Sequence, residues 1–374
     1  MKQFVGILVF VAIVGAGGLM WRSSSHPPVG ESFSQQAPRG VRESGNIVGS
    51  WEDQVSTQSW LPGAWAATPT PGVTIRVRQG ESIQKALQGL GASGGTVVVG
   101  PGEYRENITL PSGVRLRAEK SQTAVIIPRD TRKQTLMGWG VSRVWIEGFD
   151  IRGAVVFTQA STDFSRTVSD IVVRGNRISG SKDFNLIKFA QSARILIEQN
   201  EISDSDGRVG VDLVSVRDFS VRNNVISNIR GSNGFGVVAK GGSFSGTISG
   251  NKFSQTGNAA VACGQITGED YILPDVKKLQ FEARKITISN NDVGARDRFA
   301  LLVQAGQDCH VLDNRVTPSQ FYADIKVDIS GDTHHPAWVS RGVVIDQPGL
   351  NSARIDISDL GADVVLNGKK VSKK

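Results

Sequence analysis

The segment Ile171-Val-Val-Arg-Gly-Asn176-Arg-Ile178 is a short cassette in which alternating apolar residues are followed by Asn-x-Ile. The cassette returns around five further asparagines, spaced 24, 24, 27, 40 and 23 residues apart: Asn200, Asn224, Asn251, Asn291 and Asn314. A period in the twenties with β-branched alternation and Gly/Ser turns is typical of a solenoid with one coil per repeat. The absence of helical periodicity between the cassettes excludes a leucine-rich or helical repeat. The sequence therefore predicts an all-β fold, a right-handed parallel β-helix.

The repeated asparagines are interpreted as structural. A buried Asn at the corner of a coil can bond the turn backbone and stack on the Asn of the next coil. We therefore do not expect them to carry chemistry.

The first 22 residues predict export. Phe4 to Trp21 is an 18-residue run without a charge, flanked by Lys2 and Arg22, and it just reaches the lower limit for spanning a bilayer. A cleaved signal peptide with Val14-Gly15-Ala16 as its cleavage site is the alternative, and it would be unusually short, so an uncleaved membrane anchor is favoured. Either reading places the rest of the chain at the periplasmic face of the inner membrane or outside the cell.

Three further segments follow. Residues 23–72 are polar and rich in Pro, Gly and Ser, which indicates a tether, although its three tryptophans (Trp51, Trp60 and Trp65) suggest either packing along the domain or a ligand platform. Residues 73–367 are predicted to form the β-helix, and 368–374 a basic tail. Four lysines of that tail supply more than half of the net charge of +7. The mild excess that remains fits a polyanionic partner, no motif predicts nucleic-acid binding, and we expect a monomer.

A short capping helix is predicted at the start of the domain. Ser82 is a suitable N-cap, and Ile83, Ala86, Leu87 and Leu90 have the spacing of one apolar helical face. A parallel solenoid needs such a cover because its open end exposes core and unpaired strand edges.

The 40-residue spacing between Asn251 and Asn291 exceeds one coil, so residues 264–282 must form an excursion. Excursions of solenoids commonly wall a binding groove, and Tyr271 within this one is a candidate substrate-binding residue. Cys263 and Cys309 fall on different coils and at different points of the coil. A disulfide between them is therefore allowed but not favoured.

Three charged residues form the candidate catalytic group. Alternation turns Lys188 and Asp212 outward, each 12 residues before its asparagine, and Lys240 stands 11 before Asn251. With a turn one residue shorter, the three would form an exposed column on successive coils. Such a ladder is either a surface ion-pair stack or a site in which lysines bind a uronate carboxylate and one removes a proton.

Gly94-Gly-Thr-Val-Val-Val-Gly-Pro-Gly-Glu-Tyr104 resembles the opening coils of pectate-lyase-like β-helix proteins. Gly236-Val-Val-Ala-Lys-Gly-Gly-Ser243 is similar to the stretch around the catalytic lysine of β-helix polysaccharide lyases of the chondroitinase-B and alginate-lyase type. That resemblance implies that Lys240 is the general base of a β-elimination. The acidic calcium ligands and the arginine of that group have no counterpart in Ser232–Gly236 and Ala259–Gly264. No cofactor is therefore expected, with calcium as the open alternative.

The chain is also similar to an exported β-helix group with Lys-Gly-Gly-Ser, Gly-x-x-Thr-Gly and Phe-Glu-Ala-Arg motifs. Glu282 of the last motif is expected to anchor the excursion together with Arg284, which would also bind an acidic sugar beside the groove. Asn233, just before the Lys240 strand, is the third candidate substrate-binding residue. Asp204-Ser-Asp-Gly207 is interpreted as a turn rather than part of a calcium site. Cys309-His310 and His334-His335 lack metal-ligand spacing.

The leading hypothesis is an exported protein that binds or cleaves an acidic polysaccharide, with a lyase-like site centred on Lys240. The chief alternative is a non-catalytic carbohydrate-binding or scaffold protein. A hydrolase with paired carboxylates is least favoured, because no close pair of Asp or Glu is apparent on the predicted column.

Overall fold

A computed structural model describes residues 72–371, apart from 160–167, 269–270, 273, 320–321, 329–337, 348–350, 352–353 and 359–362. The predicted anchor and tether, with Trp51, Trp60 and Trp65, therefore lie outside the described residues, as does His334-His335. Among the described residues, no helix is long and apolar enough to cross a membrane.

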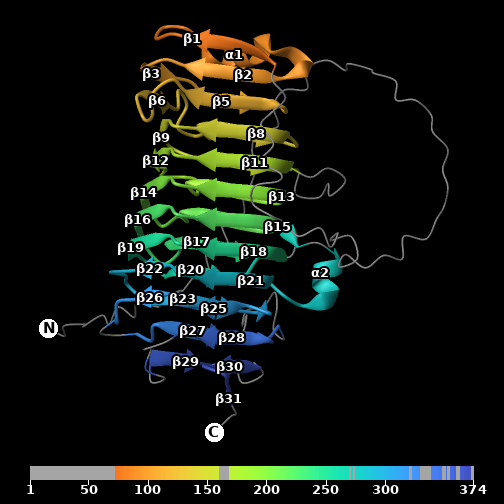
Figure 1. Ribbon diagram of the computed structural model, residues 1–374, viewed down its shortest axis with the longest axis vertical. Coiled ribbons are helices and arrows are strands. Elements are labelled where there is room, and N and C mark those ends of the chain that lie inside the picture. The colour runs from red at the N-terminus through yellow and green to blue at the C-terminus, as the bar shows by residue number, and fades with distance from the viewer. Residues whose placement is uncertain are drawn as a thin grey trace, which may run out of the picture. The chain divides into compact units, whose positions relative to one another are not determined.

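The described chain winds into stacked coils with three strand faces, and successive coils pair in parallel (Figure 1). Face A contains β4 (Ile108–Leu110), β7 (Leu136–Trp139), β10 (Val155–Thr158), the first halves of β13 (Ile187–Glu198) and β15 (Val211–Arg222), β17 (Phe235–Lys240), β20 (Ala259–Cys263), β23 (Phe299–Gln304), β27 (Ile325–Asp328) and β29 (Ile355–Ile357).

Face B contains β1 (Val73–Val77), β2 (Gly95–Val99), β5 (Val114–Ala118), β8 (Ser142–Glu147), β11 (Val168–Arg174), the second halves of β13 and β15, β18 (Ser243–Ser249), β21 (Ala283–Ser289), β24 (Gly306–Gln307), β25 (His310–Leu312), β28 (Val343–Asp346) and β30 (Val364–Leu366). Strands β13 and β15 run through the corner and join faces A and B into one sheet.

Face C contains β3 (Gly102–Arg105), β6 (Ala124–Ile127), β9 (Asp150–Arg152), β12 (Arg177–Ser179), β14 (Glu201–Asp206), β16 (Val225–Arg230), β19 (Lys252–Thr256), β22 (Asp292–Val293) and β26 (Arg315–Val316). The predicted right-handed parallel β-helix is confirmed. Inward residues of all three faces form one continuous aliphatic core.

The two ends of the described stack are built differently. At the first coils, α1 (Ile83–Gly89) buries Ile83 and Leu87. The helix follows Ser82, whose side chain accepts a hydrogen bond from Lys85 N. At the last coils, β31 (Lys369–Val371) pairs antiparallel with β30. Part of the expected basic tail is thus a strand, and lysines on such an edge disfavour pairing with another chain.

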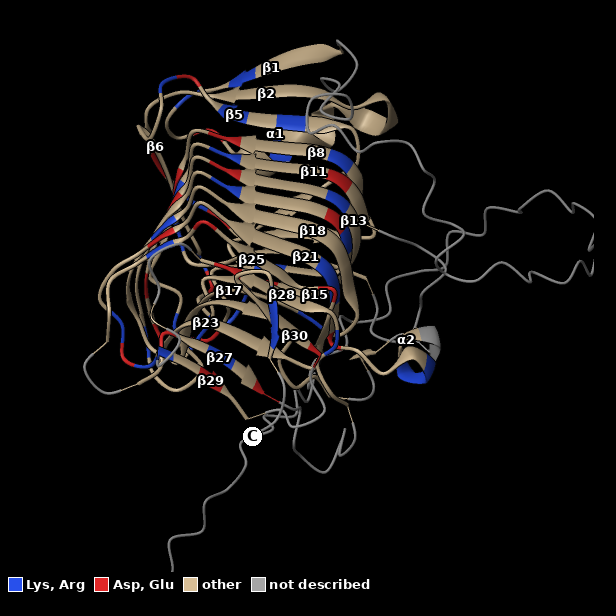
Figure 2. Ribbon diagram, turned by 60° about the horizontal axis from the view of Figure 1, so that its bottom comes forward, with Lys and Arg blue, Asp and Glu red and all other residues tan. Residues whose placement is uncertain are grey.

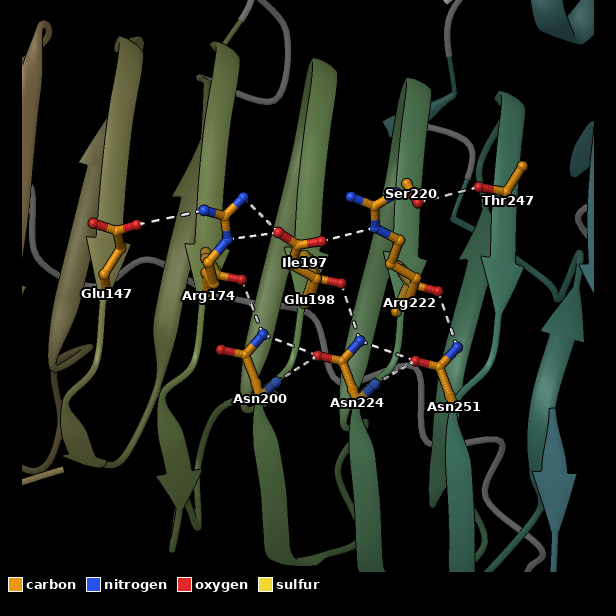
Figure 3. A network of polar contacts seen from close by, with 12 residues as sticks. Glu147, Arg174, Ile197, Glu198, Asn200, Ser220, Arg222, Asn224, Thr247 and Asn251 are labelled. Atoms are coloured by element: carbon orange, nitrogen blue, oxygen red, sulfur yellow. Dashed lines mark hydrogen bonds and ion pairs between the residues drawn. The ribbon is translucent and has the colours of Figure 1, made fainter. Parts of the chain in front are cut away.

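The asparagines form one ladder between faces B and C (Figure 3). From Asn200 to Asn314, each Oδ1 accepts hydrogen bonds from the backbone N and the Nδ2 of the preceding asparagine. Asn176 Oδ1 accepts from Phe149 N at the start of the ladder, and Gln347 Oε1 accepts from Asn314 at its end. Asn251 Nδ2 lies 3.0 Å from Asn291 Oδ1 although 40 residues separate them. The predicted excursion therefore leaves the stack without interrupting it.

Charges on faces B and C are arranged with alternating sign (Figures 2 and 3). On face B, Arg174 contacts Glu147 at 3.8 Å and Glu198 at 2.5 Å, and Arg222 contacts Glu198 at 2.7 Å. On face C, Arg177 lies 3.0 Å from Glu201. Because these cations have acidic neighbours on the adjacent coils, the ladders offer a polyanion little net positive charge.

Candidate functional site

Lys188 and Asp212 lie side by side on face A. They are register partners of β13 and β15, and Lys188 Nζ is 3.2 Å from Asp212 Oδ2. The expected exposure of Asp212 is wrong, because its side chain is only 3% exposed. Asn185, in the turn before β13, donates its Nδ2 to Asp212 Oδ2 at 2.7 Å and accepts from Val209 N, and these bonds help enclose the carboxylate.

Lys240 does not continue the Lys188–Asp212 column. It pairs with Val214, and Val238 stands beside Asp212. The corner between Lys240 and Asn251 is one residue longer than the same corner within β15, since Val214 pairs with Lys240 and Arg217 with Phe244, and not one residue shorter as expected. Because the displacement is two residues, Lys240 still points to the outer side of face A. Its Nζ donates to Gln265 Oε1 at 2.6 Å, and the part of the chain described contains no acidic group in salt-bridge contact with it.

Electrostatics nevertheless link the three groups. Burial acts to raise the pKa of Asp212, but the charges of Lys188 and Lys240, with hydrogen bonds from Lys188 and Asn185, outweigh burial and lower that pKa. Asp212 therefore carries a negative charge at neutral pH that offsets one of the two lysine charges. The group as a whole carries one net positive charge.

One carboxylate oxygen of Asp212 can accept a further hydrogen bond. Its Oδ1 is buried and has no hydrogen-bond partner among the described residues. A buried carboxylate oxygen is rarely left without a donor. The other oxygen bonds Lys188 and Asn185, so the carboxylate contacts these two side chains and is closed to solvent.

The excursion 264–282 is anchored at the Lys240 end of face A. Glu282 is fully buried and accepts hydrogen bonds from Gly241 N, Thr267 N and Thr267 Oγ1. Glu282 thus anchors the excursion as expected. Arg284 instead pairs with Asp308 at 3.3 Å on face B.

The Lys-Gly-Gly-Ser motif is explained by this packing. Gly241 and Gly242 have φ of +63° and +86°, and a Cβ on Gly242 would lie 2.6 Å from Val276 of α2 (Pro274–Leu279). Ser243 Oγ accepts a hydrogen bond from Val216 N. The same hydroxyl donates to backbone carbonyls at the corner, where Leu213 O lies at 3.1 Å and Lys240 O at 2.8 Å. Glycine is therefore needed where the excursion lies on the corner.

Tyr271 is the one substrate-binding candidate that lies near Lys240. Ser215 Oγ contacts both Gly241 O, at 2.6 Å, and Tyr271 O, at 3.0 Å, and the Tyr271 side chain is 40% exposed. Asn233 is exposed before the opposite end of β17, and the five residue steps from Phe235 to Lys240 span roughly 17 Å. Neither Asn233 nor Arg284 contacts the group of Lys188, Asp212 and Lys240.

Several polar residues were missed by sequence reasoning. Asn185, Ser215 and Gln265 each contact a candidate residue or the adjoining corner, yet they stand in turns or at a strand corner, where no periodic pattern marks them. Lys326 on β27 was also missed. It lies 3.1 Å from Asp328 and 3.8 Å from Asp356, so this second charged group on face A is acidic overall.

The weaker metal candidates have structural partners. Asp204 accepts hydrogen bonds from Asn228 and Ser203. The predicted turn is wrong, because Asp204, Ser205 and Asp206 lie in β14 and only Gly207 follows the strand. Among the described residues, no group of three or more His, Cys, Asp or Glu could hold a metal ion.

The two cysteines are bonded to each other, against expectation. Cys263 and Cys309 form a disulfide with a Cα–Cα distance of 6.7 Å. Cys263 ends β20 and Cys309 follows β24 on the next coil, so both buried side chains meet at the corner of faces A and B. The repeat register alone did not favour this disulfide, because the excursion 264–282 separates the two cysteines in the sequence.

Comparisons with known proteins agree with the fold. A family model described as a right handed beta helix region matches residues 142–270. The A-module of a mannuronan C-5 epimerase from Azotobacter vinelandii is 14% identical with a TM-score of 0.51, over 76% of this chain and 87% of that one. A second such A-module from the same organism is 16% identical with a TM-score of 0.50, over 78% and 95%. No curated protein sequence matches significantly.

A hyperthermoactive exopolygalacturonase from Thermotoga maritima is also similar in structure. It is 12% identical with a TM-score of 0.50, over 78% of this chain and 88% of that one. Three strand faces, parallel coils and the asparagine ladder define the class, a right-handed parallel β-helix.

Proposed function

We propose that the protein binds an acidic polysaccharide on the outer side of face A. The observation that carries this proposal is the pair of lysines, Lys188 and Lys240, held around one buried carboxylate, Asp212. The alternating ladders of faces B and C lack such an excess of positive charge. The structural neighbours, named for acting on mannuronan and polygalacturonate, support a polymer of uronic acids as the ligand class.

We propose that this polysaccharide binding takes place outside the cytoplasm. Disulfides persist in oxidising compartments, and Cys263–Cys309 is buried within the solenoid. The apolar run at Phe4–Trp21 fits export, with the membrane as a second partner if the run is retained.

Replacing either lysine should weaken binding. For Lys240→Ala and Lys188→Ala we expect at least about a tenfold rise in Kd for a uronate polymer, since each removes a charge-assisted contact to a carboxylate. Binding should fall as salt rises. Calorimetric titration with a uronate polymer and with a neutral polymer of similar length measures both effects.

The matched control is Lys252→Ala, because Lys252 is an exposed lysine of face C. Its Kd should equal that of wild type. Since Lys188→Ala also leaves Asp212 without its salt bridge, a melting curve must show that this variant is folded. Equal Kd values for all four proteins, or equal binding of the neutral polymer, would refute the proposed site.

A second candidate function is β-elimination, favoured by the different partners of the two lysines. Lys188 is paired with a carboxylate, whereas Lys240 Nζ donates to the neutral side chain of Gln265. In the proposed step, Lys188 neutralises the uronate carboxylate and Lys240, in its neutral form, takes the α proton. The C–H and the β C–O bonds break, a C=C bond forms, and the leaving oxygen takes a proton from water.

The non-catalytic alternative differs from the lyase in one respect. A binding or scaffold protein would retain the lysine-dependent affinity without forming an unsaturated product. Both readings share the same site, so the binding experiment tests what they have in common.

A further inference from the structure

The disulfide lies at the root of the excursion. Cys263 is the last residue of β20, and Gln265, the acceptor of the Lys240 ammonium, follows two residues later. At Gly306 a Cβ would lie 2.7 Å from Cys309 Sγ and 3.1 Å from Cys263 O, so this glycine leaves room for the bond between the two coils.

The same coil also holds the far end of the excursion. Gln307, two residues before Cys309, donates from Nε2 to Leu279 O at 3.3 Å and to Gln280 O at 3.4 Å. The disulfide therefore links the start of the excursion to the coil whose Gln307 side chain bonds the C-terminal part of the excursion. Between them, Val276 is fully buried against Gly242.

We infer that the Cys263–Cys309 disulfide is a positioning device for Lys240: it clamps the excursion 264–282 against the corner, so that Gln265 and the Tyr271 backbone are held beside the lysine. Reduction by a dithiol would convert the bond into two thiols while the dithiol is oxidised to its own disulfide. The clamp is then released. The asparagine ladder and the parallel pairing of the coils keep the coils stacked, and the two thiols remain part of the buried core.

Limited trypsin digestion tests the clamp without any ligand. Lys277 and Lys278 are exposed on α2, within the excursion, and Lys252 is exposed on face C of a nearby coil. In Cys263→Ala/Cys309→Ala, cleavage after Lys277 or Lys278 should be at least about tenfold faster than in wild type, because the cross-link no longer restrains local opening. Cleavage after Lys252, followed by mass spectrometry in the same digests, should not change.

Wild-type protein treated with dithiothreitol provides the same test if the double variant does not fold. Circular dichroism must show an unchanged β signal in the reduced protein. An unchanged rate of cleavage in α2 after complete reduction would overturn the inference. Loss of the β signal, or equally accelerated cleavage at Lys252, would also overturn it, because the disulfide would then be a staple of the whole solenoid.

A coupling experiment tests the link to Lys240 and rests on the proposed function. Reduction should raise the Kd of wild type for a uronate polymer, but should leave the Kd of Lys240→Ala unchanged, since the contact to be positioned is already gone. Equal effects of reduction on both proteins would mean that the clamp does not act through Lys240. If neither protein binds any polymer, the proposed function fails, while the digestion still decides whether the clamp exists.

Discussion

Asn224→Ala should lower the free energy of unfolding by about 4 kcal/mol. Asn224 is 1% exposed and takes part in four hydrogen bonds of the ladder. Its Oδ1 accepts from Asn200 N and Nδ2, both at 2.9 Å, and its Nδ2 donates to Ile197 O at 3.0 Å and to Asn251 Oδ1 at 2.9 Å. Alanine would remove all four bonds and leave the buried Asn200 N without its acceptor, while Asn251 Oδ1 keeps the backbone N of residue 224 and Asn200 Nδ2 keeps Val173 O. Urea denaturation followed by circular dichroism gives the value.

Two further variants separate lost hydrogen bonds from lost volume. Asn224→Leu has a side chain of similar size, so it should be destabilised about as much as Asn224→Ala if the hydrogen bonds dominate. Asn233→Ala, at an exposed position, should change stability by no more than about 0.5 kcal/mol. An Asn224→Leu variant as stable as wild type would mean that the ladder contributes packing rather than polar satisfaction.

Lys240→Ala should slow formation of unsaturated uronate at least about 10²-fold, if the elimination proceeds as proposed. The Lys240 ammonium lies at 2.6 Å from Gln265 Oε1 and stands on the rim of the corner, so its loss should hardly affect the fold. Absorbance near ~235 nm, where the conjugated product of the elimination described above absorbs, follows the reaction with a panel of uronate polymers.

Lys252→Ala serves as the control and should retain the wild-type rate. Equal rates for Lys240→Ala and wild type would exclude Lys240 as the base. A flat trace for wild-type protein on every polymer would contradict the elimination and leave the non-catalytic alternative.

Most of the fold follows from the sequence because it repeats. A buried Asn at each corner fixes where a coil turns, and alternation on either side fixes which residues point inward. The excursion was predictable for the same reason, since the interval from Asn251 to Asn291 is too long for one coil.

The site was less predictable because it depends on turns, whose lengths vary from coil to coil. Lys240 was placed in the wrong register since the corner after β17 is one residue longer than the corner within β15. Asp212 was expected outside because alternation cannot show that Asn185 reaches over it from another turn. The disulfide was unexpected because the excursion hides that Cys263 and Cys309 belong to adjacent coils.

Lysine acetylation with and without a uronate polymer tests the central claim most directly. Mass spectrometry reports the modification rate of each lysine in the wild-type protein. The proposed function predicts that the polymer slows acetylation of Lys188 and Lys240 and leaves Lys252 on face C unchanged. Protection of Lys252 to the same degree, or no protection of Lys188 and Lys240 at a polymer concentration that saturates binding, would contradict a site on face A.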